Sequence, residues 1–219
     1  IALVAILGPS LVNVVLALSV MNRRAGAAIS LFPVASERVK PSIVSGFGTN
    51  PENVAVLGDV RDDVLFTPNA SDRAAALVRD LIPREFAGAT VVLFAPTWRD
   101  GGADPTVPSE REWADIARWL DEHDAVLLVR NHPLGRGDFS TGPRHSDRIV
   151  LIGPDRVRDL NPLLWAINAV LTDYSSIVFD YALVGGPVVH FTPDLGAYTS
   201  SRGFYLDPNE FIGGVPATT

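Results

Sequence analysis

Short apolar runs alternate along this chain with stretches whose apolar side chains recur at helical spacing. This alternation is typical of a parallel sheet that is covered by helices on both faces. We therefore expect an α/β fold built on a Rossmann-like parallel sheet. The runs expected to form its strands are residues 54–57, 91–95, 125–129, 149–152, 169–171 and 187–191.

Three helices are predicted between these runs. Ser109 and Glu112 form a capping box ahead of an apolar stripe at i, i+3, i+4 and i+7, so a helix begins directly after Ser109. A second helix is predicted over residues 70–82, because the next residue is a proline, which cannot continue a helix. A third begins near residue 175 or 176 and ends at the glycine pair 185–186.

Residues 1–21 carry no charged side chain, and two arginines follow them. An uncharged run of this length with a basic flank is the pattern of a membrane helix whose flank lies in the cytoplasm. A glycine-proline pair interrupts the run, and an element buried at the edge of a larger domain would have the same composition. Residues 1–21 are therefore expected to be a membrane anchor or a remnant of an upstream domain. Residues 30–219 are expected to form the ligand-binding domain.

Composition excludes several classes of function. The formal net charge of −7, from 18 basic and 25 acidic residues, argues against nucleic acid as a partner. The chain has no cysteine and therefore no disulfide, zinc-thiolate site or thiol nucleophile. It also lacks a Walker loop, a Rossmann glycine motif and a G-x-S-x-G elbow. Transfer from a nucleotide diphosphate remains, and such transfer needs helix termini and cations, so neither a metal site nor a cofactor is expected.

Polar segments follow three of the expected strands. They are residues 96–99, 130–133 and 172–176. In open α/β sheets, ligands bind beyond the carboxyl ends of the strands. We therefore expect the three segments to crowd one rim of the sheet.

The segment that ends in Ser175 and Ser176 passes from a strand into a helix, where hydroxyls and free N–H groups can hold a phosphate. Ordinary capping of the helix by one of these serines would give the same pattern. Asp180 lies one helical turn beyond Ser176, where its carboxylate could accept a hydrogen bond from a ribose or glycerol hydroxyl. The alternative for Asp180 is a solvated helix residue.

His132 precedes a proline that holds it extended, so its ring can point into the cleft. Its neighbours Arg130 and Asn131 place a cation, an amide and an imidazole in one tripeptide, which suits a diphosphate better than a core. A structural role is expected for the other histidines, which are His123 at the end of a helix, His145 in a polar loop and His190 in a strand.

Taken together, these segments resemble the CDP-glycerol:poly(glycerophosphate) glycerophosphotransferase family over most of residues 34–215. The segments that carry the resemblance are Ser36 with Phe47-Gly48, Gly58 to Asp63, Phe94 to Arg99, Arg130 to Pro133, Thr172 to Ser176 with Phe179-Asp180, and Arg202 to Tyr205. Val60 stands where the family usually has a proline before the arginine, which is a small departure.

The resemblance implies the C-terminal, donor-binding half of a GT-B fold. It also implies transfer of glycerol phosphate, or a related polyol phosphate, from a CDP-linked donor to a teichoic-acid-like polymer at the cytoplasmic face of the cell membrane, with release of CMP. His132 is the expected catalytic residue. The donor contacts that the resemblance implies are Arg61, Pro96, Thr97, Arg130, Asn131, His132, Ser175, Ser176 and Asp180.

The family also has a His-Gly-x-Pro motif upstream of this domain, and its histidine is the expected base for the acceptor hydroxyl. The chain has no histidine before His123. We therefore expect a piece of a longer protein, because a base must reach the proton that it removes. Two alternatives remain, which are a GT-B glycosyltransferase for another nucleotide sugar and a non-catalytic nucleotide-binding accessory domain.

Overall fold

The structure is a computed structural model, and it describes residues 16–99, 104–132, 135, 137–201 and 203–204. The chain divides into two compact units, Ile1–Asp63 and Val64–Thr219. The expected division into residues 1–21 and 30–219 stays a prediction.

The first unit contains a small parallel sheet of two strands. Residues 16–28 are helical, and the elements that follow are β1 (Phe32–Val34), α2 (Lys40–Phe47), the 3-10 helix η1 (Pro51–Asn53) and β2 (Val54–Val56). β1 pairs with β2 in register from Phe32↔Val54 to Val34↔Val56. The apolar run at residues 54–57 is thus a strand, as predicted, but it pairs with β1 and does not join the main sheet.

Helix 16–28 packs closely against α2 at Gly26. A Cβ atom at this position would lie 2.4 Å from the carbonyl oxygen of Phe47, so only glycine fits. Thr49 donates a hydrogen bond from its hydroxyl to the carbonyl oxygen of Gly26 (3.2 Å). Within the described part of the chain, no helix is both long enough and apolar enough to cross a membrane. Residues 1–15 of the expected anchor lie outside the described residues, so the membrane contact stays a prediction.

The second unit is built on a sheet of five parallel strands. Their order is β5-β4-β3-β6-β7, and every neighbouring pair is parallel. The strands are β3 (Thr90–Phe94), β4 (Ala125–Val129), β5 (Ile149–Leu151), β6 (Ala169–Thr172) and β7 (Val188–His190). The five predicted strands after residue 90 are therefore confirmed.

The three predicted helices are also confirmed. They are α3 (Ala70–Leu81), α4 (Glu110–Glu122) and α6 (Ile177–Ala182). Ser109 and Glu112 make both hydrogen bonds of the predicted capping box. The sequence favours Leu77, Val78 and Leu81 as the apolar face of α3, but in the structure Ala74 and Val78 are buried whereas Leu77 is 44% exposed. The remaining elements of this unit are α5 (Gly142–His145), α7 (Leu195–Ser201) and the 3-10 helices η2 (Val60–Phe66, which crosses the boundary between the units), η3 (Arg84–Phe86) and η4 (Asn161–Ala166).

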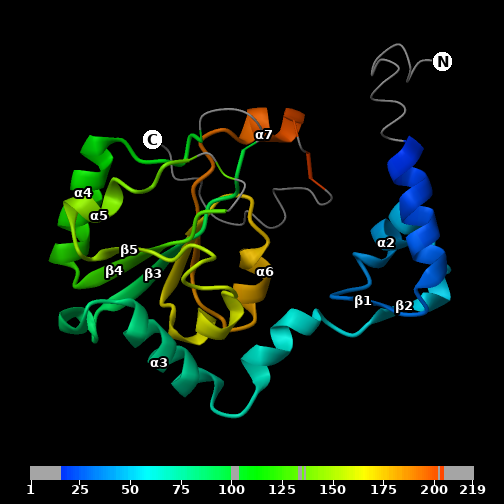
Figure 1. Ribbon diagram of the computed structural model, residues 1–219, viewed down its shortest axis with the longest axis horizontal. Helices are drawn as coiled ribbons and strands as arrows, with labels where there is room; N and C mark the ends of the chain where they lie inside the picture. The colour runs from blue at the N-terminus through cyan, green and yellow to red at the C-terminus, as the bar shows by residue number, and fades with distance from the viewer. Residues whose placement is uncertain (1–15, 100–103, 133–134, 136, 202, 205–219) are drawn as a thin grey trace. The chain divides into compact units, whose positions relative to one another are not determined.

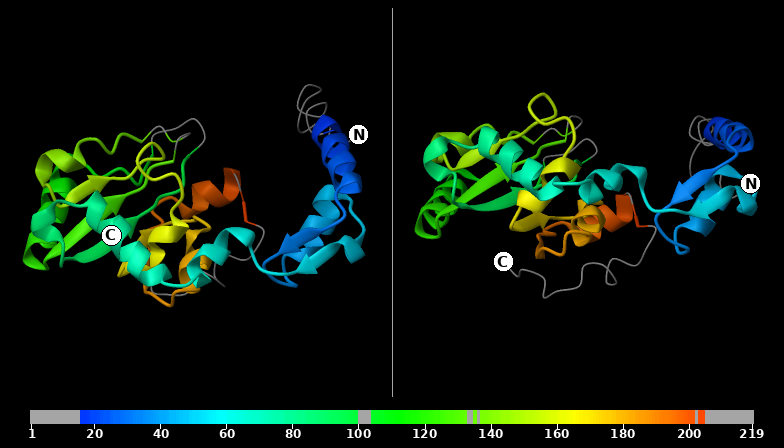
Figure 2. Two further views of the ribbon diagram at one scale, coloured as in Figure 1. Left: turned by 60° about the horizontal axis from the view of Figure 1, so that its bottom comes forward. Right: turned by 90° about the horizontal axis from the view of Figure 1, so that it is seen from below.

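Helices cover both faces of the main sheet (Figures 1 and 2). Alternate residues of β3, β4 and β5 enter different apolar clusters, as strand geometry requires. Leu93 and Leu128 face one cluster together with side chains of α3, η4 and α6. Phe94 and Leu127 face the other, where α4 contributes Trp113 and Leu120.

The strand order is that of a doubly wound sheet. The chain starts at the central strand β3, adds β4 and β5 on one side, and then crosses over to add β6 and β7 on the other. The switch point lies between β3 and β6, which is where such sheets bind ligands. Phe94 aligns with both Val129 and Leu171, so the loops that follow β3, β4 and β6 leave the sheet at the same level.

Candidate functional site

The loops after β3 and β6 are bonded to each other at the switch point. The hydroxyl of Thr172 donates to the carbonyl oxygen of Ala95 (2.6 Å). The backbone N–H of Thr97 donates to Oδ1 of Asp173 (2.8 Å), and Asp173 is only 1% exposed. The loop at Pro96 and Thr97 is therefore held by a buried carboxylate of the neighbouring loop.

Thr97 presents a buried hydroxyl that has no hydrogen-bond partner among the described residues. Such groups are uncommon, because an unsatisfied buried polar atom costs about 1–3 kcal/mol. Pro96, the other residue predicted from this loop, is buried. The free hydroxyl of Thr97 is suited to a ligand that enters at the switch point.

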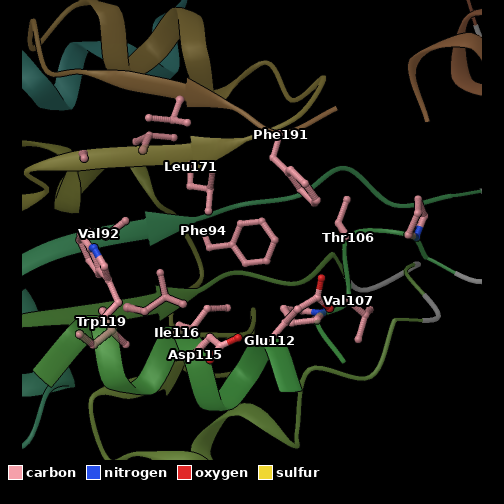
Figure 3. Close-up of a pocket in the computed structure, with 17 residues that line it drawn as sticks. Val92, Phe94, Thr106, Val107, Glu112, Asp115, Ile116, Trp119, Leu171 and Phe191 are labelled. Carbon is pink, nitrogen blue, oxygen red and sulfur yellow. The ribbon is translucent and has the colours of Figure 1, made fainter. Parts of the chain in front are cut away.

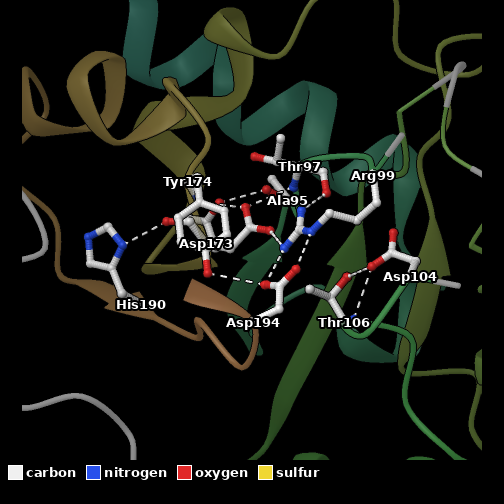
Figure 4. Close-up of polar contacts among 10 residues, drawn as sticks. Ala95, Thr97, Arg99, Asp104, Thr106, Asp173, Tyr174, His190 and Asp194 are labelled. Carbon is white, nitrogen blue, oxygen red and sulfur yellow. Dashed lines mark hydrogen bonds and ion pairs between the residues drawn. The ribbon is translucent and has the colours of Figure 1, made fainter. Parts of the chain in front are cut away.

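Arg99 forms ion pairs with two carboxylates at the same rim (Figure 4). Its Nη2 lies 2.8 Å from Oδ2 of Asp173, and its Nε lies 2.7 Å from Oδ2 of Asp194. Burial lowers the pKa of Arg99, but hydrogen bonds and charge from Asp194 and Asp173 outweigh it and raise the pKa above its usual range. The hydrogen bond from Arg99 in turn lowers the pKa of Asp194. Burial and the charge of Asp194 raise the pKa of Tyr174, whose hydroxyl donates to Asp194 (3.1 Å).

His132 reaches the rim from the loop after β4. Its exposed ring stacks on Trp98 of the β3 loop, with ring centroids 5.6 Å apart and an angle of 20° between the planes. The structure thus brings the β4 loop to the β3 loop, as predicted. Pro133, which was expected to hold His132 extended, lies outside the described residues.

Arg130 points back under the rim. Its Nη1 donates to the carbonyl oxygens of Ile152 (2.9 Å) and Val157. Burial lowers the pKa of Arg130, and the charges of Asp159 and Asp155 oppose this shift. Arg130 therefore ties the loop after β5 to the end of β4. Its neighbour Asn131 faces that same loop and lines a cavity of about 790 Å³ with residues that include Gly153, Asp155 and Arg156.

The serines and Asp180 lie at the start of α6. The hydroxyl of Ser175 accepts a hydrogen bond from the N–H of Ile177 (3.4 Å), which is a capping contact. Ser176 is exposed, and its side chain makes no capping bond to the helix. Asp180 is 5% exposed, so the alternative of a solvated helix residue is wrong. Arg61 belongs to the first unit, where it pairs with Asp59 (3.3 Å), and its contact with a donor stays a prediction.

The remaining histidines have structural partners. His190 places its Nδ1 2.9 Å from the carbonyl oxygen of Asp173, so this nitrogen carries the proton. His123 stacks on Trp119 at the end of α4. His145 was expected in a polar loop but ends the short helix α5, and its Nε2 lies 2.7 Å from Glu110. A proline early in α5 starts this turn of helix, and the four-residue turn is too short to show helical periodicity.

Four residues at the rim were not predicted as site residues. They are Arg99, Asp173, Tyr174 and Asp194. The first three lie in the motifs that were inspected, but only their neighbours were selected. Asp194 lies four residues beyond β7 and was not considered. Inspecting the carboxyl end of this strand, as for the other three, would have pointed to Asp194.

The main sheet also carries an apolar cavity of about 560 Å³ (Figure 3), and none of these four polar residues lines it. It extends across β3, β6 and β7 beside α4, and Phe94, Leu171, Phe191 and Trp119 are among its lining residues. None of the predicted site residues lines it. A nucleotide diphosphate needs polar partners, so we locate the candidate site at the rim and not in this cavity.

Several curated proteins that are similar in sequence to this chain are named as teichoic acid polymerases. The teichoic acid ribitol-phosphate polymerase TarK of Staphylococcus aureus is 30% identical over 83% of this chain and 35% of the relative. A teichoic acid poly(ribitol-phosphate) polymerase of Bacillus spizizenii is 32% identical over 85% of this chain and 30% of the relative. A poly(glycerol phosphate) polymerase of Bacillus subtilis is 31% identical over 68% of this chain. The chain thus spans about a third of the length of the first two relatives.

Solved structures of the wall teichoic acid polymerase TagF share the fold. One matches with a TM-score of 0.66 and 24% identity over 85% of this chain and 45% of TagF. A TagF variant soaked with CDPG matches with a TM-score of 0.65 and 25% identity over 87% of this chain and 45% of that chain. The sequence profile of the CDP-glycerol:poly(glycerophosphate) glycerophosphotransferase family matches residues 22–219. The rim motifs, the GT-B type of fold and this match together show that the chain belongs to the CDP-glycerol:poly(glycerophosphate) glycerophosphotransferase family.

Proposed function

We propose that this chain binds the CDP-linked donor of a transferase that adds polyol phosphate units to a growing teichoic-acid-like polymer. The donor is CDP-glycerol or a related CDP-polyol, and CMP is released. Relatives named for ribitol phosphate and for glycerol phosphate both match the chain, so both donors belong in the test.

The observation that carries this proposal is the convergence of three loops at the switch point of the sheet. Thr97 offers a buried hydroxyl for which the described residues provide no partner, and His132 offers an exposed imidazole stacked on Trp98. Ser176 adds an exposed hydroxyl at the start of α6. These neutral hydrogen-bonding groups suit a diphosphate at a rim whose buried cation, Arg99, is already paired with carboxylates.

The proposed transfer moves one phosphorus between two oxygens. The acceptor hydroxyl oxygen bonds to the phosphorus that carries the polyol, and the bond from that phosphorus to the bridging oxygen breaks. CMP leaves with the electron pair, and the hydroxyl proton passes to a general base, which we expect upstream of this domain from the resemblance to the family. His132 donates a hydrogen bond to the departing phosphate, where charge develops, and Arg130 adds positive charge behind the loop.

Calorimetric titration of the full chain tests the proposal. CDP-glycerol, CDP-ribitol and CDP are the positive probes, and a UDP-sugar is the control, which shares the diphosphate and differs in the base and in the attached group. We expect at least one CDP-polyol to bind about tenfold more tightly than the UDP-sugar, a difference of roughly 1.4 kcal/mol. Equal affinity for the UDP-sugar would favour a transferase for nucleotide sugars. A folded chain that binds no CDP compound would refute donor binding.

A further inference from the structure

Arg99 lies at the centre of a cluster to which three loops contribute. The loop after β3 supplies Arg99, the loop after β6 supplies Asp173 and Tyr174, and the segment from β7 into α7 supplies Asp194 and Tyr198. We call these five residues the Arg99 cluster. All three segments start at the carboxyl edge of the sheet (Figure 4).

Hydrogen bonds use most of the donors of Arg99. Nε and Nη2 donate to the two oxygens of Asp194 (2.7 and 2.9 Å), and Nη2 also reaches Oδ2 of Asp173 (2.8 Å). Nη1 donates to the carbonyl oxygen of Thr97. Three of the five N–H groups of a guanidinium therefore donate to protein oxygens, and the ion pair with Asp173 adds a fourth contact. Arg99 holds protein loops and presents little of its charge to a ligand.

Two tyrosine rings also pack against the guanidinium group of Arg99. The guanidinium carbon lies 5.1 Å from the ring centroids of Tyr174 and Tyr198, within cation–π range. The two rings stack on each other with centroids 4.0 Å apart. The side chain of Arg99 is only 10% exposed, and those of Asp173 and Asp194 are 1% and 18% exposed. A planar guanidinium suits this arrangement, whereas the point charge of a lysine would not reproduce it.

The cluster acts directly on the residue with the free hydroxyl. Asp173 accepts the N–H of Thr97 through Oδ1 while its Oδ2 pairs with Arg99. Arg99 also bonds the carbonyl oxygen of Thr97. Both backbone groups of Thr97 are thus held by the cluster. Asp173 further accepts the N–H of Tyr174 (2.6 Å), directly before Ser175.

We propose that Arg99 is a positioning residue of the donor site, which fixes the loops after β3, β6 and β7 so that Thr97 and the two serines directly before α6 are preorganised for the diphosphate. This inference rests on the proposed function for its ligand. Loops that are ordered before binding lose less conformational entropy when the ligand enters. Loosening the cluster should therefore weaken donor binding although Arg99 does not touch the donor.

Arg99→Lys is the first test variant, because it keeps the charge and loses the two-point contact with Asp194 and the bond to Thr97. We expect the Kd for the CDP-polyol that the wild type binds to rise about tenfold or more, with unchanged stoichiometry. A purely structural role would lower the binding-competent fraction, and hence the stoichiometry, without changing Kd.

Hydrogen exchange of backbone amides, measured by NMR, tests the order of the loops without any donor. The Thr97 and Tyr174 amides should exchange about tenfold faster, while that of Leu127 in β4 stays unchanged.

Tyr174→Phe is the second variant, and it decides the question if Arg99→Lys does not fold. It removes only the hydroxyl bond to Asp194 and should raise Kd about threefold. Tyr181→Phe is its matched control, because it removes a buried hydroxyl bond to the carbonyl oxygen of Ile167, outside the cluster, and should leave Kd unchanged.

Folded variants with wild-type Kd and wild-type exchange at Thr97 would overturn the positioning role. If the wild type binds no CDP compound, the proposed function fails, and with it the link to the donor, whereas the exchange rates still show whether Arg99 orders the loops.

Discussion

Removing the hydroxyl of Thr97 should weaken donor binding without lowering the stability of the fold. Thr97→Val keeps the shape of the side chain and removes a buried hydroxyl that has no described partner. We expect the free energy of unfolding to stay equal or rise, because an unsatisfied buried group costs about 1–3 kcal/mol. The Kd for the CDP-polyol should rise about fivefold through the loss of one hydrogen bond. Urea unfolding and calorimetry measure the two quantities.

Thr90→Val is the control for that change, since exposed Thr90 begins β3 at the edge of the sheet opposite the rim. It should alter neither Kd nor stability by much. A Thr97→Val chain that binds the donor as tightly as the wild type would show that the hydroxyl takes no part in binding.

Residue type alone predicts the location of the rim site better than it predicts which side chains point into that site. A cation, an amide and an imidazole in sequence predicted a shared site, yet Arg130 bonds two backbone carbonyls whereas His132 is exposed beside Trp98. Whether each side chain points toward the rim or back under the sheet depends on the backbone conformation and on the position of the loop after β5. The tripeptide sequence specifies neither of these.

At the scale of elements, α4 tests how much a local signal contributes to the fold. Ser109 accepts the N–H of Glu112, and the Glu112 carboxylate accepts from Ser109 in return (2.7 Å). Ser109→Ala removes the hydroxyl, which accepts from the N–H of Glu112 and donates to the Glu112 carboxylate (2.6 Å), and should lower the free energy of unfolding by about 1 kcal/mol. Thermal and urea unfolding measure this loss.

Ser71→Ala makes the same substitution at an exposed position inside the first turn of α3. Alanine is the better helix former there, so this variant should be as stable as the wild type or slightly more stable. An equal loss in both variants would mean that the capping box adds nothing beyond the serine itself.

Helices and strands of the second unit were predicted well because their signals are local. The capping box at Ser109 and the continuous apolar runs of β3 and β4 are signals that act within a few residues. The strand at residues 54–56 was also predicted, but its partner β1 was not. Pairing depends on which other strand comes near, and a three-residue strand carries too few side chains to specify this.

For the whole molecule, the Arg99 cluster predicts how stability depends on pH. The hydrogen bond from Arg99 lowers the pKa of Asp194 in the fold. A carboxyl with a lowered folded-state pKa contributes stability above its unfolded pKa of about 3.9, and this contribution is lost as pH falls through the folded pKa. The free energy of unfolding should therefore decrease as pH falls below about 4. Asp194→Asn should show a shallower decrease, as measured by urea unfolding between about pH 2.5 and 7.

Asp115→Asn provides the comparison for this measurement. Asp115 pairs with Arg118 on the surface of α4, where both side chains are more than half exposed and solvent screens the charges. Its acid profile should follow that of the wild type. A profile of Asp194→Asn that also follows the wild type would show that the ion pair with Arg99 adds no pH-dependent stability.

The sequence by itself determined the α/β class, five strands and three helices of the main unit, and the rim where polar segments gather. These features follow from periodicity, capping residues and the rule that ligands bind beyond the carboxyl ends of parallel strands. Only the tertiary structure decided which polar groups at that rim form hydrogen bonds and ion pairs within the protein. Arg99, Asp173 and Asp194 lie far apart in the chain and pair because β3, β6 and β7 end at one edge of the sheet. Long-range pairing of this kind depends on strand order, and strand order is a property of the folded chain as a whole.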